Sequence, residues 1–380
     1  MPPAKDHQRS APARTGNGRA QRRTAGFVAV VLAGLAIAPT KGGAMDLLDR
    51  RPPPKPGPSP TDANPQLSAQ QSMFDLGATF LERAGDQMSW GPNAVRRNNP
   101  GGGGASQDAA PQTFRSWAEL YGINSRTDAQ GTFTGDQRRT YGGVGGLGAT
   151  VAPGLNLGAT VDVSNSKIDM PASLQSADLG LTQVGVNASY TFGAWTLAAV
   201  YVHGWGNIAA ERDTLRGASL SSYQGRLDGA LGEVSYYWSS GQSRIVPKLG
   251  FEYARAVTDG FRETGGFNPV TGGPVTGDRA KILAGAELGH YFVINGHVLD
   301  LSGYGKLVDN VMQNLDPFAI TAHGQFISVQ GIVESRYGAD AGAGLSYGLS
   351  EALRLYANYD GKFRENFVAH QGTLGLEVRW

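Results

Sequence analysis

In Leu155–Ser164 (LNLGATVDVS), apolar and polar residues alternate without interruption. The leucine, alanine and valine residues share one face of an extended chain, and the Asn, Gly, Thr, Asp and Ser residues share the other. The same period of two recurs in four more segments: Gln183–Phe192, Arg244–Tyr253, Leu353–Asp360 and Thr373–Trp380. The pattern predicts β-strands that each have one apolar and one polar face.

The length and the charge of these segments favour a membrane barrel over a soluble sheet. They run to about ten residues, whereas strands of globular proteins usually have about five or six and a tilted membrane strand needs about 9–11. The polar face also carries charged residues, which suit a water-filled lumen: Arg244, Lys248, Glu252, Lys281 and Glu287. Apolar side chains would then face lipid.

Connections of two lengths alternate along the chain, as periplasmic turns and extracellular loops do in outer-membrane barrels. The short ones are Ala152–Gly154, Gly193–Ala194, Ser239–Gln242, Asn295–Gly296 and Ser350–Glu351. The long ones are Thr127–Gln137, Asp169–Asp178, Ala210–Leu220, Asp259–Gly277 and Asn314–Ser335. Counting hairpins predicts an all-β fold: an antiparallel transmembrane β-barrel of about twelve strands, spanning residues 117–380.

Residues 1–44 have the features of a signal peptide that the Sec translocon would recognise. Seven basic residues and one acidic residue accompany the apolar run Ala25–Ala38, and small residues follow at Gly42–Ala44. Arg22-Arg23 also matches part of a twin-arginine signal. Without residues 1–44 the chain has 26 basic and 31 acidic residues, a net charge of −5, which gives no reason to expect nucleic-acid binding.

Between this segment and the barrel, the sequence predicts a helix flanked by two linkers. Residues 45–66 are rich in proline and residues 91–116 are rich in glycine. Within residues 67–90, Ser68 and Gln71 form a capping-box pattern, and four apolar residues recur at helical spacing: Met73, Leu76, Phe80 and Ala84. Leu67–Met88 would form a rod of about 30 Å, close to the hydrocarbon thickness of a bilayer. This amphipathic helix could occupy a polar pore or lie loosely on the surface.

The chain from Ser116 to Trp380 resembles the C-terminal translocator domain of autotransporters (type V secretion). The resemblance rests on Ser116–Gly122 (SWAELYG), 285–309, Arg336–Leu349 (RYGADAGAGLSYGL), Leu353–Gly361 (LRLYANYDG) and Gly372–Trp380 (GTLGLEVRW). It implies a twelve-stranded barrel in the bacterial outer membrane, a helix in its pore, and an upstream passenger that is delivered to the cell surface.

The resemblance also implies partners: outer-membrane lipid and lipopolysaccharide, periplasmic chaperones, and the barrel assembly machinery. The last strand would present the assembly signal, with Leu374, Leu376, Val378 and Trp380 on one face. In one respect the chain departs from the family, because only about twenty Pro-rich residues separate the predicted cleavage site from the helix.

No catalytic constellation is visible in the sequence. The six His residues lack metal-ligand spacing, no P-loop or G-x-S-x-G motif occurs, and Cys is absent. We therefore expect no enzymatic activity, no cofactor and no metal. The leading interpretation is a translocator barrel that presents a short N-terminal segment; the alternatives are a porin-like channel and an adhesin that acts through its loops.

Overall fold

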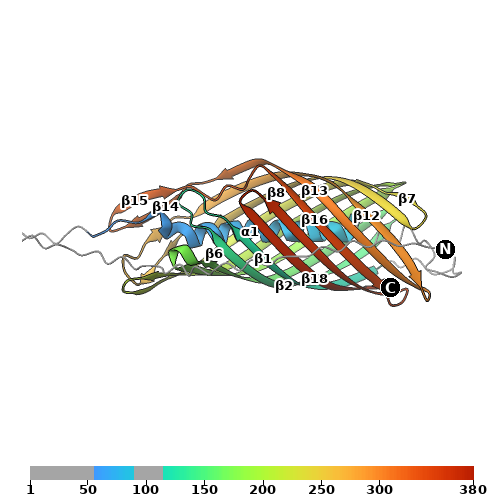
Figure 1. The fold of residues 1–380 in the computed structure, drawn as a ribbon, viewed down its shortest axis with the longest axis horizontal. Coiled ribbons are helices and arrows are strands. Elements are labelled where there is room, and N and C mark those ends of the chain that lie inside the picture. The colour runs from blue at the N-terminus through green and yellow to red at the C-terminus, as the bar shows by residue number, and fades with distance from the viewer. Residues whose placement is uncertain (1–54, 90–113) are drawn as a thin grey trace, which may run out of the picture. The chain divides into compact units, whose positions relative to one another are not determined.

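The computed structural model describes residues 55–89 and 114–380 (Figure 1). These residues belong to one compact unit, Pro54–Trp380. The predicted signal peptide, residues 45–54 of the Pro-rich linker and residues 91–113 of the Gly-rich linker lie outside the described residues.

In this part of the chain, twelve long strands form a closed antiparallel barrel, as the hairpin count predicted. Each strand pairs with the next along the chain, and the last pairs with the first, so the barrel wall has no free edge. The wall strands are β1 (Phe114–Thr127), β2 (Asp136–Ala152), β3 (Leu155–Met170), β4 (Gln175–Phe192), β5 (Trp195–Thr214), β6 (Gly217–Tyr236), β8 (Ser243–Thr258), β12 (Val275–Ile294), β13 (His297–Leu315), β16 (Tyr337–Gly348), β17 (Leu353–Arg364) and β18 (Phe367–Arg379).

The two faces of the wall reverse the usual order of a soluble protein. In β3, Val163 is 57% exposed on the outer surface, while its neighbour Asp162 is 1% exposed and points into the lumen. The predicted lumen charges of β8 and β12 are buried in the same way. An apolar exterior around a polar interior is the arrangement that a hydrocarbon surrounding requires.

The two ends of the barrel differ. The turn end, at the right of Figure 1, has short hairpin turns and Trp380. The loop end, at the left, has the long connections. At the turn end, Gly154, Gly193, Gly241, Asn295 and Gly296 take positive φ values, which tight hairpins need. A short extra strand, β7 (Trp238–Ser240), extends the hairpin between β6 and β8 there.

Two predicted long loops are mostly strand. In the predicted loop Ala210–Leu220, only Leu215 and Arg216 lie outside β5 and β6. In the predicted loop Asp169–Asp178, most residues belong to β3 or β4. The ladder continues there although the alternation fades, because polar residues such as Glu211 and Asp213 also occupy the outer face. Periodicity therefore marks where the outer surface is apolar, not where the backbone pairing ends.

Two of the remaining long connections, those after β8 and after β13, form a small second sheet at the loop end. Its strand order is β15 (Gln325–Val329), β14 (Phe318–Ala322), β11 (Thr271–Gly272) and β9 (Phe261–Arg262). Phe261 stacks on Phe318 with ring centroids 5.9 Å apart, and Tyr223 of β6 lies 5.6 Å from Phe261. Strand β10 (Thr264–Gly265) joins this region to β6, and the short helix η2 (Pro171–Ser173) connects β3 to β4. The aromatic cluster fixes the long connections over the mouth.

Glycine allows the closest approach between two wall strands. A Cβ atom added to Gly285 of β12 would lie 2.2 Å from the backbone oxygen of Gly305 in β13, whereas one added to Gly305 would meet nothing within 4 Å. Backbone atoms cannot move aside as a side chain can. Gly285 is therefore required where β12 and β13 meet.

We expect Gly285→Ala to destabilise the barrel by about 1–3 kcal/mol or more, because the added methyl group overpacks against the backbone. The measurement is the temperature at which the folded, fast-migrating band is lost on a gel of unheated protein. Gly305→Ala is the matched control and should leave that temperature unchanged. Equal behaviour of the two variants would contradict the prediction.

Candidate functional site: the plugged lumen

The long helix of the described residues, α1 (Asn64–Ser89), lies inside the barrel (Figure 1). It follows the short helix η1 (Pro60–Ala63). Its first residue, Asn64, donates hydrogen bonds to Thr134 (2.9 Å) and Ser173 (3.4 Å) in connections at the loop end. Near its other end, Gln87 donates to Glu119 (3.0 Å) and Tyr356 (3.3 Å) of the wall. Within residues 55–89 and 114–380, no helix has the length and hydropathy that crossing a membrane would need.

The apolar residues that predicted the helix are all buried in the lumen: Met73, Leu76, Phe80 and Ala84. Helix residues pack where wall glycines leave room. Met73 contacts the positions of Gly206 and Gly225, and Phe80 lies 3.3 Å from where a Cβ of Gly185 would stand. Leu81, which the sequence reasoning did not single out, fills the space at Gly229. Ser68 lies within the helix rather than at its start and donates a short hydrogen bond to Asp136.

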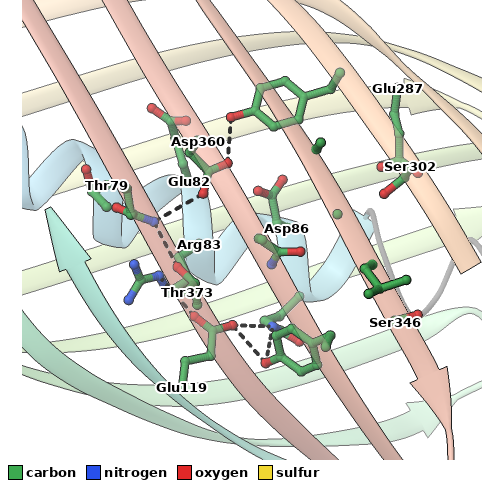
Figure 2. A pocket seen from close by; sticks show the side chains of 18 of the residues that line it. Thr79, Glu82, Arg83, Asp86, Glu119, Glu287, Ser302, Ser346, Asp360 and Thr373 are labelled. Atoms are coloured by element: carbon green, nitrogen blue, oxygen red, sulfur yellow. Dashed lines mark hydrogen bonds and ion pairs between the residues drawn. The ribbon is translucent and has the colours of Figure 1, made fainter.

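Ion pairs hold the polar face of α1 to the wall. The carboxylate of Glu82 lies 2.6 Å from Lys306 Nζ and 2.9 Å from Lys362 Nζ, and its side chain is 14% exposed. Both lysines come from the wall, from β13 and β17. One helix carboxylate thus contacts two partly buried wall cations (Figure 2 shows Glu82 facing the cavity).

Three more charged residues of the helix have wall partners. Asp75 pairs with Arg138 at 2.6 Å, and Asp86 pairs with Lys248 at 3.0 Å. Arg83 pairs with Glu119 at 3.2 Å, and its guanidinium lies 4.0 Å from the ring centroid of Tyr121. The helix is therefore complementary to the lumen in charge as well as in shape.

A cavity of about 130 Å³ lies between the C-terminal half of α1 and the wall strands β1, β12, β13 and β16–β18 (Figure 2). Six carboxylate side chains line it, against two cationic ones, Arg83 and Lys362. The carboxylates are Glu82, Asp86, Glu119, Glu287, Asp300 and Asp360. In the described residues, no cluster of three or more His, Asp or Glu side chains is arranged to hold a metal ion. We therefore assign no metal to this cavity.

At the loop end, the segment 330–336, which we call the strap, folds inward between β15 and β16. Its Glu334 is 4% exposed and lies 2.9 Å from Arg364 Nε, 3.4 Å from Arg279 and 3.5 Å from Lys281. Burial disfavours the charged form of Glu334, but the three cations outweigh this cost and lower its pKa to about 2. Glu334 is therefore ionised at physiological pH.

The segment before α1 is held where it passes the loop end. Arg212 of β5 lies 3.2 Å from Asp62 and 2.5 Å from Glu263. Gln175 donates to the carbonyl of Thr61 (3.0 Å), and Asn268 donates to the carbonyl of Gly57 (3.0 Å). These contacts hold residues 57–62 at the loop end of the barrel.

The residues of the predicted assembly signal lie on β18 and at the C-terminus. Leu374, Leu376 and Trp380 are exposed on the outer surface, and Val378 is half-buried. Trp380 stacks on Phe114 of β1 with ring centroids 6.4 Å apart, at the seam where the barrel closes. The structure gives these positions; recognition by another protein stays a prediction.

Comparison with known proteins agrees with this geometry. The family model "Autotransporter beta-domain" matches residues 116–360. The fold is similar to the translocator domain of the autotransporter NalP from Neisseria meningitidis (TM-score 0.65, 15% identity, 84% of this chain and 99% of that one). It is also similar to the β-domain of the Bordetella autotransporter BrkA (TM-score 0.55, 14% identity, 70% of this chain and 100% of that one).

A curated relative, an extracellular serine protease of Serratia marcescens, is 23% identical over 277 residues. The match covers 70% of this chain but 26% of the protease, and a second protease of the same description and organism shows the same coverage. This chain therefore spans about a quarter of the length of the curated relatives that it matches.

Proposed function

Since this chain belongs to the autotransporter β-domain family, we propose that its barrel carries the segment upstream of α1 across the bacterial outer membrane and leaves it at the cell surface. The family places the barrel in that membrane as part of type V secretion. The described part of the chain would then serve transport.

One observation carries the proposal: α1 threads the lumen, with Asn64 at the loop end and Gln87 toward the turn end. The first barrel strand begins at the turn end with Phe114, so in the described residues α1 leads from the loop end toward the turn end through the barrel interior. In outer-membrane barrels the long loops face the exterior. The residues before Pro60 would therefore emerge outside the cell.

The earlier steps of the pathway follow from the same proposal. Residues 1–44 would direct the chain to the Sec translocon, periplasmic chaperones would keep it unfolded, and the assembly machinery would recognise β18. Outer-membrane lipid and lipopolysaccharide would then cover the apolar outer face. The exported segment in this chain would include the Pro-rich residues 45–59.

An epitope inserted between Pro54 and Lys55 should be labelled by antibody on intact cells. The matched control is the same epitope in the Asn295–Gly296 turn, at the opposite end of the barrel, which should be labelled only after the outer membrane is permeabilised. If the first epitope also required permeabilisation while the barrel migrated as a folded band, the proposed direction of transport would be wrong.

A further inference from the structure

One row of residues on α1 alternates, at every fourth position, between a large side chain and no side chain. The row consists of Met73, Gly77, Leu81 and Gly85. Glycine destabilises the interior of a helix relative to alanine, and neither glycine of this row takes a positive φ that would call for it. The two glycines therefore serve a purpose outside the helix backbone, and the wall beside them indicates which.

The lumen face of β6 shows a similar alternation at every second position. Its row consists of Gly225, Leu227, Gly229 and Leu231. Helix and strand pack against each other, and both run from the loop end toward the turn end. Four helix residues rise by about 6.0 Å and two strand residues by about 6.7 Å, so the two repeats are closely matched in length.

Large side chains of the helix fill the glycine positions of the strand. Met73 Sδ lies 2.7 Å from where a Cβ atom of Gly225 would stand, and Leu81 Cδ1 lies 2.8 Å from the corresponding point at Gly229. Both helix side chains are fully buried. A methyl group at either glycine would therefore displace the helix side chain that now occupies the space.

Large side chains of the strand fill the glycine positions of the helix in return. The fully buried Leu227 occupies the space where a Cβ atom of Gly77 would stand. Leu231 Cδ2 lies 3.0 Å from where a Cβ atom of Gly85 would stand. Large and small residues thus alternate in opposite order along the two elements, and we call these eight residues the zipper.

The sizes in the zipper match at one position of α1 along the barrel axis. If the helix moved by four residues toward the turn end, about 6 Å, Met73 would meet Leu227 and Gly77 would meet Gly229. Large residues would then overlap while glycines faced empty space, and overpacking and cavities are both unfavourable. A shift of eight residues would match sizes again but would keep only two of the four pairs.

The ion pairs of the helix select its position less strictly. Glu82 pairs with Lys306 and Lys362, and a lysine has a flexible four-carbon stem that can follow a displaced helix over several ångströms. A leucine packed against a glycine has no such reach. The zipper is therefore the part of the helix–wall contact that distinguishes one position from the next.

We propose that the zipper sets the axial register of α1 and thereby fixes which residues of the chain remain outside the barrel when export ends. In the observed register Asn64 lies at the loop end, and Ser59 is already exposed. This inference rests on the proposed transport, since the boundary that it defines is the boundary of the exported segment. The register itself can be measured without transport.

The test maps the register by cysteine labelling of the purified full chain, folded in detergent. The chain has no cysteine, so a single cysteine at each position from 57 to 68 is unique, and a charged maleimide with mass spectrometry shows which positions are accessible. In wild type the boundary between labelled and protected positions should fall between Ser59 and the buried Ala63.

An inverted helix keeps the composition of α1 and reverses its pattern. It carries four substitutions: Met73→Gly, Gly77→Met, Leu81→Gly and Gly85→Leu. This pattern matches β6 only after a shift of four residues, so the labelling boundary should move by four positions. A helix that merely packs less well would leave the boundary where it is.

Inverting the strand as well should return the boundary to its wild-type position. The further substitutions are Gly225→Met, Leu227→Gly, Gly229→Leu and Leu231→Gly. The matched control exchanges the two large helix residues, Met73→Leu with Leu81→Met. It keeps the alternation and nearly the same volume, so its boundary should not move.

A smaller pair of variants covers the case in which an inverted chain does not give the folded, fast-migrating band. Gly77→Leu should lower the temperature at which the protected positions become labelled, because two leucines then compete for one space. Adding Leu227→Gly should restore most of that temperature. A loss that this second change does not relieve would count against the zipper.

The proposal would be overturned by a folded inverted helix with the wild-type boundary, or by a doubly inverted chain whose boundary stays shifted. Complete labelling of the inverted helix supports the proposal if inverting β6 restores protection, and overturns it if not. Surface labelling of the epitope after Pro54 reports on transport independently. A labelled epitope with an unmoved boundary would end this inference alone, and an unlabelled epitope with a moved boundary would end the transport proposal alone.

Discussion

Replacing Glu82 with alanine should detach the middle of α1 from the wall and open the lumen. The substitution leaves Lys306 and Lys362, which are 11% and 18% exposed, without the carboxylate that both contact. Breaking a buried ion pair by removing one partner costs about 3–5 kcal/mol, because the remaining charge is desolvated without compensation. We expect trypsin to cut at Arg83 in the unheated, folded barrel, and the cut to be detected by mass spectrometry.

The control for this variant replaces the whole group of charges. Changing Glu82, Lys306 and Lys362 together to methionine removes the unpaired cations while keeping similar volume, and apolar replacements of buried ion pairs are often neutral or stabilising. The triple variant should resist trypsin at Arg83 as wild type does. If Glu82→Ala were equally resistant, apolar packing alone would hold the helix, and the ion pairs would contribute little.

Replacing Leu376 with arginine should greatly reduce the amount of folded barrel in the outer membrane. Leu376 is exposed on the outer face of β18, and arginine on the lipid face costs about 2–4 kcal/mol at mid-membrane depth. If the assembly machinery also recognises this strand, the loss in cells should exceed what the lower stability explains.

The neighbouring strand supplies a matched variant. Leu355 of β17 is the register partner of Leu376 and is exposed on the same face to a similar extent, 45% against 42%. Leu355→Arg should therefore reduce the unfolding free energy of the refolded protein by a similar amount. The prediction requires cells to contain much less folded Leu376→Arg than Leu355→Arg; equal amounts would mean that the face of β18 serves lipid contact alone.

The sequence predicted the wall well because lipid and water impose a strict pattern on it. Where one face meets hydrocarbon and the other meets a polar lumen, alternation reveals the strand, as in Leu155–Ser164. Beyond the part of the wall that has an apolar outer face, the outer face is polar as well. The end of β5 at Thr214 and the start of β6 at Gly217 therefore gave no such signal. The Gly-rich stretch of β2 became interpretable only in three dimensions: Gly142 and Gly146 leave room for the rings of Tyr121 and Trp117.

The contacts of the helix could not be predicted in the same way. Its charges were evident, and an amphipathic rod of suitable length suggested a pore. However, the partners of Glu82 lie on β13 and β17. The stagger between neighbouring strands around the whole barrel decides which lysine lies beside which turn of the helix, and the sequence does not give this stagger. The strap escaped detection because Glu334 is one acidic residue in a long polar connection, and burial distinguishes it only after folding.

The pairing of β1 with β18 also limits when folding can occur. Arg115 pairs with Arg379, so the first strand must wait for its neighbour until nearly the whole chain has been synthesised. At about 5–20 residues per second, that interval is roughly 10–50 s, during which an unpaired strand edge could join other chains. Whatever prevents aggregation of this protein must therefore act for tens of seconds, a period that lengthening the chain between the two strands would extend in proportion.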